Sequence, residues 1–186
     1  MAHIRFNLII ITFLLSSAGY AHAFCDDTDS FLDKACQRVT DTWTQGDSDL
    51  YIPFHTYHLR FNYTQEKLDS YRENAWGIGY GRSHYDESGN LDSLYGMTFL
   101  DSHSKLQYVA GYSHQWMWGQ QQAWHAGLGY AAFLTARSNY VHYVPIPGIV
   151  PVASVNYDKV SINAAYIPGF TKNNGNVMLF WSTVGF

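Results

Sequence analysis

Apolar and polar side chains alternate along most of the chain after residue 50. About eight runs of near ten residues show this pattern, the length that a tilted strand needs to cross the hydrocarbon of a membrane. Turn signals such as Ser88-Gly89-Asn90, Asn174-Gly175 and Pro145-Ile146-Pro147-Gly148 separate the runs. The expected strands are residues 54–63, 76–85, 91–100, 106–116, 123–134, 149–157, 160–167 and 177–186. The pattern predicts an all-β fold, an eight-stranded antiparallel transmembrane β-barrel.

The alternation also predicts which side chains face the interior of the barrel. In the first run, the polar phase is expected to face the lumen and consists of His58, Arg60 and Asn62. In the fifth run, the inward phase consists of His125, Gly127, Gly129 and Ala131. Water-filled pores are rarely lined by such small, uncharged side chains. Small inward residues instead leave an apolar cavity for one hydrocarbon chain inside a narrow barrel.

The last run ends on an aromatic residue, Phe186, in the same phase as Met178, Phe180 and Val184. A terminal aromatic residue on the lipid-facing phase is typical of outer-membrane barrels, which are surrounded by aromatic girdles. This feature predicts a place in the outer envelope of a Gram-negative bacterium.

Residues 24–48 follow a different pattern, in which apolar positions recur at helical spacing. These positions are Phe31, Leu32, Ala35, Cys36, Val39 and Trp43. They predict one amphipathic helix, and the sequence leaves open whether it packs on the barrel rim, lies in the membrane interface or acts as a simple plug or clamp. If Cys25 and Cys36 both lay on this helix, they would be roughly 16 Å apart, too far to form a disulfide.

The first 23 residues predict a secretory signal peptide. They combine a basic start that includes Arg5, an apolar run from Leu8 to Leu15 and the small-residue ending Ala21-His22-Ala23. Cleavage is expected after Ala23. The apolar run is too short to span a bilayer as a helix.

Composition narrows the class of protein. Aromatic residues make up 17% of the chain and charged residues 14%, which suits a membrane barrel with interfacial Tyr and Trp. The net charge of −4 becomes −5 when Arg5 leaves with the signal peptide, and this argues against a nucleic-acid partner. Histidines outside the first run lack metal-ligand spacing, so no metal site is expected; examples are His84, His103, His114 and His142.

Short motifs give a more specific indication. They are Leu50-Tyr51-Ile52-Pro53, Tyr57-His58 with Arg60-Phe61, Asp101-Ser102, Thr135-Ala136-Arg137, Tyr166-Ile167-Pro168-Gly169 and Asn173-Asn174-Gly175-Asn176. In order and approximate spacing, from about Trp43 to Phe186, the chain resembles the lipid A palmitoyltransferase family PagP.

After the signal peptide expected at 1–23, the resemblance implies an amphipathic helix at 24–48 and an outer-membrane barrel at 49–186. It also implies transfer of a palmitoyl or similar long acyl chain from the sn-1 position of a glycerophospholipid to lipid A. That reaction would protect the cell against cationic antimicrobial peptides. The resemblance implies no cofactor, and we expect an integral, monomeric membrane protein.

The resemblance also implies roles for individual residues. The catalytic set is His58, Asp101 and Ser102. Substrate binding falls to Gly111, Ser113 and Arg137, and recognition of lipopolysaccharide to Asp92. Lateral gating of lipids, which uses the missing N–H of proline, falls to Pro53, Pro151, Pro168 and Lys172.

The three catalytic candidates suit acyl transfer chemically. The reaction needs a group that moves a proton and donors that stabilise an oxyanion. An imidazole such as His58 fits the first task, and Ser102 fits either a nucleophile or a hydrogen-bond donor. Successive strand residues face opposite sides, so Asp101 and Ser102 are expected at a strand-to-loop transition. Without the resemblance, an Asp-Ser pair is usually a turn and a lumen histidine usually a satisfied polar residue.

Three positions depart from the family pattern. Ala75 replaces a proline before Trp76-Gly77, so the gate beside Pro53 is expected to be weaker or differently built. Ser113 replaces a glycine at the floor of the acyl pocket and is expected to shorten it by about one or two methylenes. The loop near Lys172 carries one extra residue, and Lys172 is the nearest counterpart of the family's gating tyrosine.

Two other functions fit less well. A non-catalytic small barrel with a structural or surface-interaction role is the main alternative, but long polar external loops would favour it and the loops here are short. A soluble lipocalin-like carrier comes third, because outward aromatic residues and Phe186 are poorly placed in water.

Overall fold

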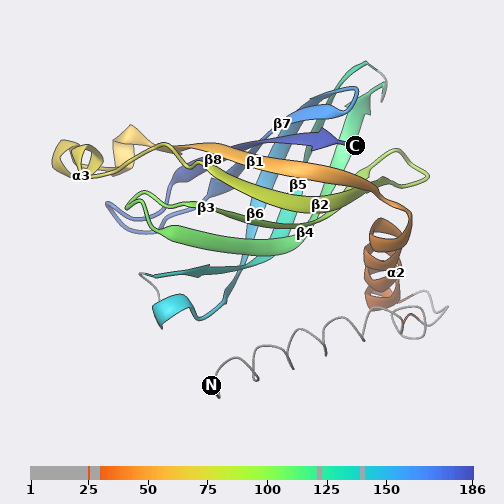
Figure 1. Cartoon of the computed structure of the whole chain (residues 1–186), viewed down its shortest axis with the longest axis horizontal. Coiled ribbons are helices and arrows are strands. Elements are labelled where there is room, and N and C mark those ends of the chain that lie inside the picture. Colours follow the sequence, from red (N-terminus) through yellow and green to blue (C-terminus); the bar gives the residue numbers. More distant parts are fainter. Residues whose placement is uncertain (1–24, 26–29, 121–122, 139–140) are drawn as a thin grey trace, which may run out of the picture.

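The computed structural model describes residues 25, 30–120, 123–138 and 141–186. Within these residues, eight strands form a closed antiparallel barrel in which each strand pairs with the next and β8 pairs with β1 (Figure 1). The strands are β1 (Asp47–His58), β2 (Gly77–Tyr85), β3 (Leu91–Leu100), β4 (Leu106–Gly119), β5 (Trp124–Arg137), β6 (Ile146–Tyr157), β7 (Val160–Ile167) and β8 (Val177–Gly185). The predicted barrel is confirmed. The expected signal peptide, with its cleavage after Ala23, lies outside the described residues.

The two ends of the barrel differ. At one end, which we call the helix end, α2 (Phe31–Gln45) leads into the start of β1 (Figure 1). At the opposite end, the loop end, η3 (Arg60–Asn62) and α3 (Gln65–Asp69) connect β1 to β2. The short helix η4 (Val141–Tyr143) connects β5 to β6 at this same end.

The first strand does not lie where the alternation placed it. It ends at His58, and Arg60 and Asn62, predicted to face the lumen, belong instead to a 3-10 turn. The Asn62 side chain donates hydrogen bonds to the carbonyls of Thr171 and Asn174, at 3.2 and 3.3 Å. Because these contacts with the β7–β8 loop satisfy its amide, the chain leaves the sheet although its sequence still alternates.

A β-bulge in β1 decides which of its side chains face inward. The register with β8 shifts between Pro53 and His55. Before the shift the buried positions include Tyr51 and Pro53, whereas after it they are Thr56 and His58. Side chains of a regular strand alternate strictly, so the extra residue moves His58 into the lumen phase.

The other predictions about faces are confirmed. In β5, His125, Gly127, Gly129 and Ala131 are buried, whereas Leu128 between them is 53% exposed. In β8, the outward phase includes Phe180, and the terminal Phe186 is 71% exposed. Exposed apolar side chains on the outside of a closed barrel are what a hydrocarbon environment requires.

Helix α2 lies against the barrel wall at the helix end. The Ser30 hydroxyl caps it by accepting a hydrogen bond from the Asp33 N–H at 3.2 Å. The helix packs against β2 and β3, with Thr42 fully buried and Leu32 75% exposed. No helix among the described residues is long and apolar enough to cross a membrane.

The prediction that Cys25 and Cys36 cannot pair is wrong. They form a disulfide with their Cα atoms 5.7 Å apart. The premise of one continuous helix fails, because the helix begins at Phe31 and Cys25 lies outside it. A structural disulfide fits an oxidising compartment outside the cytoplasm.

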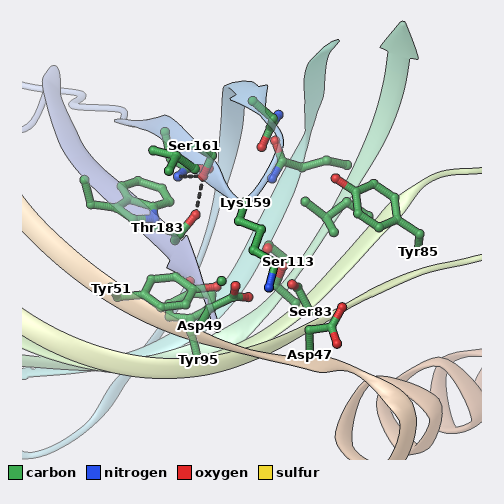
Figure 2. A pocket seen from close by; sticks show the side chains of 18 of the residues that line it. Asp47, Asp49, Tyr51, Ser83, Tyr85, Tyr95, Ser113, Lys159, Ser161 and Thr183 are labelled. Atoms are coloured by element: carbon green, nitrogen blue, oxygen red, sulfur yellow. Dashed lines mark hydrogen bonds between the residues drawn. The ribbon is translucent and has the colours of Figure 1, made fainter. Parts of the chain in front are cut away.

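Among the residues that the structure describes, side chains divide the barrel interior into two cavities. The upper cavity, toward the loop end, has a volume of about 450 Å³ and a largely apolar lining. The lower cavity, toward the helix end, has a volume of about 170 Å³ and a largely polar lining (Figure 2). Tyr95 and Trp181 line both and separate them. Tyr51 stacks on Tyr95 with ring centroids 5.5 Å apart, which thickens this partition.

Candidate active site

His58 and Ser102 meet at the loop end of the upper cavity. The Ser102 Oγ lies 3.1 Å from the Nε2 of His58, and both residues line the cavity. His58 is the last residue of β1 and is only 3% exposed. Strand β3 ends at Leu100, so Asp101 and Ser102 occupy the strand-to-loop position predicted for them. A hydroxyl and an imidazole at this distance can exchange a proton.

The Asp101 carboxylate organises the turn that carries Ser102. Its Oδ1 accepts hydrogen bonds from the N–H groups of His103 and Lys105, at 2.9 and 2.8 Å. The backbone of Asp101 also exchanges hydrogen bonds with Ser104 and Lys105. Its Oδ2 is buried without a hydrogen-bond partner among the described residues. The structure thus brings Asp101 close to the site, and the hydrogen bonds that its Oδ1 accepts come from its own turn.

Glu73 is a site residue that the sequence did not reveal. Its Oε1 lies 3.1 Å from the backbone N of His58 and 3.3 Å from the Nδ1 of the same residue. Its Oε2 accepts a hydrogen bond of 2.8 Å from Arg60. Partial burial raises the pKa of Glu73, but the bonds from Arg60 and His58 outweigh it and hold that pKa below its usual value.

The position of Glu73 comes from backbone pairing outside the regular strands. The N–H of Thr56 donates to the Glu73 carbonyl at 2.7 Å, and the N–H of Ala75 donates to the Phe54 carbonyl at 3.2 Å. These bonds continue the contact between β1 and the segment before β2. No motif or spacing signals them, because residues 73–75 lie before the second expected strand and show no strand pattern in the sequence.

Aromatic rings enclose the imidazole of His58. Tyr71 stacks on it with ring centroids 4.6 Å apart, and Tyr63 meets it edge-on at 5.2 Å. The hydroxyl of Tyr63 donates a hydrogen bond to the carbonyl of Gly175. The two rings therefore fix the plane in which the imidazole lies.

The upper cavity extends from His58 and Ser102 down to the partition formed by Tyr95 and Trp181. Its middle part is apolar and is lined by Met97, Phe99, Val109, Ala131, Val150, Val152 and Leu179. Arg137, the last residue of β5, lines it near the loop end. An apolar cavity with polar groups only at its mouth suits a hydrocarbon chain that carries one polar end.

Two of the predicted substrate-binding residues lie outside this cavity. Ser113 lines the lower cavity, beyond the partition (Figure 2). Gly111 is absent from the lining of both interior cavities, because the backbone and Cβ of Phe133 occupy the adjacent space. A Cβ at Gly111 would approach the carbonyl oxygen of Ala132 to 2.4 Å, so close strand contact explains the glycine.

The sheet ladder is interrupted at two seams near the loop end. Pairing of β1 with β2 stops at Tyr51 opposite Gly79, and Pro53 follows. Pairing of β6 with β7 stops at Val152 opposite Ala165, and Pro151 precedes. Pro168 follows β7 directly. Three of the predicted gating residues, Pro53, Pro151 and Pro168, therefore flank the ends of the two seams. Lys172 lies exposed in the loop between β7 and β8.

Asp92 lies at the helix end, far along β3 from the catalytic candidates. It is 1% exposed, and its Oδ1 accepts hydrogen bonds from the Tyr112 hydroxyl and from His114 Nδ1, the latter at 2.7 Å. Arg38 of α2 lies 3.4 Å from the same nitrogen. This buried network favours a role in docking the helix, and recognition of lipopolysaccharide by Asp92 stays a prediction that its position does not support.

The chain matches known proteins over most of its length. Residues 38–183 match the family model described as "Antimicrobial peptide resistance and lipid A acylation protein PagP". A protein of Methylobacillus flagellatus named lipid A acyltransferase PagP is 49% identical over 99% of this chain and all of that protein. A Yersinia enterocolitica protein of the same name is 40% identical over 89% of this chain and 81% of its own. A protein of the same name from Bordetella parapertussis is 44% identical over 91% of this chain and 92% of its own length.

We expect Asp92→Ala to lower the free energy of unfolding by about 3 kcal/mol, because it leaves the buried His114 and the half-buried Tyr112 without their acceptor. Urea titration of the folded barrel in detergent, followed by circular dichroism, measures this change. Glu87→Gln, an exposed change in the neighbouring β2–β3 turn, is the matched control. A loss of less than about 0.5 kcal/mol, typical of exposed sites, would contradict the docking role.

Proposed function

Because this chain belongs to the PagP family of lipid A acylation proteins, we propose that it transfers an acyl chain from a phospholipid to lipid A in the outer membrane. The observation that carries the proposal is the 3.1 Å contact between Ser102 Oγ and His58 Nε2 at the mouth of the apolar cavity. A barrel with exposed apolar side chains around its wall supports an integral, multi-pass location in that membrane.

The reaction exchanges one ester for another. The bond between the acyl carbon and the glycerol oxygen of the donor breaks, and a bond to a lipid A hydroxyl oxygen forms. The proton of that hydroxyl passes to the leaving alcohol, and the proposed carrier is His58 Nε2, whose 3.1 Å contact with Ser102 Oγ supports this role. Ser102 acts beside it, either as the nucleophile of a covalent intermediate or as a donor to the oxyanion.

The upper cavity is proposed to hold the acyl chain during transfer. Its volume of about 450 Å³ is within the range of small-ligand sites, and one narrow cavity admits one chain. With the ester at Ser102, the partition at Tyr95 and Trp181 limits the length of the chain that the cavity holds. Cells with the extra acyl chain gain a more tightly packed outer leaflet and resist cationic peptides.

The alternative is a non-catalytic barrel of the same fold. One assay distinguishes the two functions: purified full-length protein is mixed with phospholipid and lipid A vesicles, and the lipid A is then analysed by mass spectrometry. We expect one added acyl chain with the unchanged protein and none with His58→Ala, because the proton carrier is gone. No added chain from correctly folded protein would favour the non-catalytic barrel.

The chain-length profile tests the proposed role of Ser113. Because Ser113 and Tyr95 line the same lower cavity, Ser113→Gly is expected to free space beneath the Tyr95 ring. We expect the transferred chain to lengthen by about one or two methylenes, with competition between donors measured by mass spectrometry. An unchanged profile would remove Ser113 from chain-length control.

We also propose that lipids reach the cavity sideways, through the β1–β2 and β6–β7 seams. Pro53, Pro151 and Pro168 lack the N–H groups that would otherwise close these seams. At Ala75 this chain has a donor where the family pattern has proline, and its N–H binds the Phe54 carbonyl. The β1–β2 seam is thereby held more firmly at this point.

Ala75→Pro removes that hydrogen bond, which is worth about 1 kcal/mol. We expect kcat/KM to rise about fivefold because opening of the seam becomes easier. Initial rates of lipid A acylation measure the effect, and Ala75→Gly, which keeps the N–H, is the control. Equal rates for the two variants would show that this bond does not limit lipid access.

A further inference from the structure

We propose that Glu73 is the positioning residue of His58: it holds the imidazole by Nδ1 so that Nε2 faces Ser102. Asp101, the carboxylate that the family pattern suggests, instead organises the loop that carries Ser102. The proposal rests on the proposed acyl transfer for its kinetic test, and it has a separate structural test.

Glu73 contacts two atoms of the same histidine with one oxygen. Its Oε1 lies 3.1 Å from the backbone N and 3.3 Å from the side-chain Nδ1 of His58. A carboxylate accepts hydrogen bonds only, so the contact places the imidazole proton on Nδ1. Nε2 then presents its lone pair to Ser102 Oγ at 3.1 Å, which is the tautomer that a proton acceptor needs.

Other neighbours of the ring do not fix this choice. Tyr71 stacks on the imidazole and Tyr63 meets its edge, and both contacts restrict the plane of the ring. A half-turn of the ring about its Cβ–Cγ bond puts Cδ2 in the place of Nδ1 and Cε1 in the place of Nε2, while leaving the stacking almost unchanged. The polar contact at Nδ1 therefore decides whether a nitrogen or a carbon faces Ser102.

Glu73 is itself held by two other residues, Arg60 and Thr56. Arg60 binds its Oε2 at 2.8 Å, and the Arg60 guanidinium lies over the Tyr57 ring at 4.8 Å. The Thr56 N–H binds its carbonyl at 2.7 Å. A carboxylate fixed in this way can orient its partner, because little side-chain freedom remains to be lost on each turnover.

Asp101 has a different set of contacts. Its Oδ1 is used by the N–H groups of His103 and Lys105. Asp101 is 5% exposed, and among the described residues no hydrogen bond joins its carboxylate to His58. Its substitution would disturb the Ser102 turn, so an essential Asp101 is compatible with an orienting role for Glu73.

The kinetic test compares Glu73→Gln with Glu66→Gln in full-length protein, using phospholipid and lipid A vesicles. Glu66 is an exposed glutamate of α3 in the same loop. We expect Glu73→Gln to lower kcat by about 10²-fold or more with KM almost unchanged, as for loss of an orienting carboxylate in other acyl-transfer sites. Glu66→Gln should match the unchanged protein.

The structural test follows the His58 ring nitrogens by ¹⁵N nuclear magnetic resonance in histidine-labelled protein. Nδ1 should carry the proton in the unchanged protein and in Glu66→Gln, whereas Glu73→Ala should give a mixture of tautomers. Glu73→Asp, which can reach Nδ1 only by a shift of its backbone, should recover part of the kcat lost in Glu73→Ala.

Two results would overturn the proposal. In the first, folded Glu73→Gln and Glu73→Ala both keep a kcat within about twofold of that of the active unchanged protein. Such a loss is far smaller than the one expected when an orienting group is removed. The other is an unchanged His58 tautomer in Glu73→Ala. If the unchanged protein transfers no acyl chain, the proposed function fails by itself, and the resonance measurement still decides the role of Glu73.

Discussion

Pairing of β1 with β8 closes the sheet, and the positions of all the functional groups depend on this closure. Inside a bilayer every backbone N–H and C=O needs a partner, and closure supplies partners along the wall without leaving an edge. It also divides each strand into an inward and an outward face. The two seams where pairing stops, beside Pro53 and beside Pro151, are therefore local exceptions, and both lie near the end of the barrel that holds His58.

Alternation predicted the barrel well because strands with one face in lipid and one in the lumen must show it. It failed at residues 59–63, where the same alternation continues while Asn62 bonds to the β7–β8 loop and the chain leaves the sheet. The bulge near Phe54 was equally hidden, because one extra residue changes phase without changing composition. The disulfide was missed because the sequence did not show that Cys25 lies outside the helix.

The candidate site was only partly accessible from sequence. His58, Asp101 and Ser102 were found through motif resemblance, and the geometry joins His58 to Ser102 directly. Glu73 could not be found, because its contact depends on pairing of an irregular segment with β1. The depth of Ser113 could not be found either, since alternation gives the side on which a residue lies but not its level relative to Tyr95.

The aromatic partition between the two cavities has a consequence for the membrane as an electrical barrier. Tyr95 and Trp181, with Tyr51 stacked on Tyr95, separate the polar lower cavity from the apolar upper cavity. Ions that enter the lower cavity meet these rings and then the apolar upper cavity, where the free-energy cost of losing their water is prohibitive. The interior of the barrel therefore offers ions no continuous polar path from one end to the other.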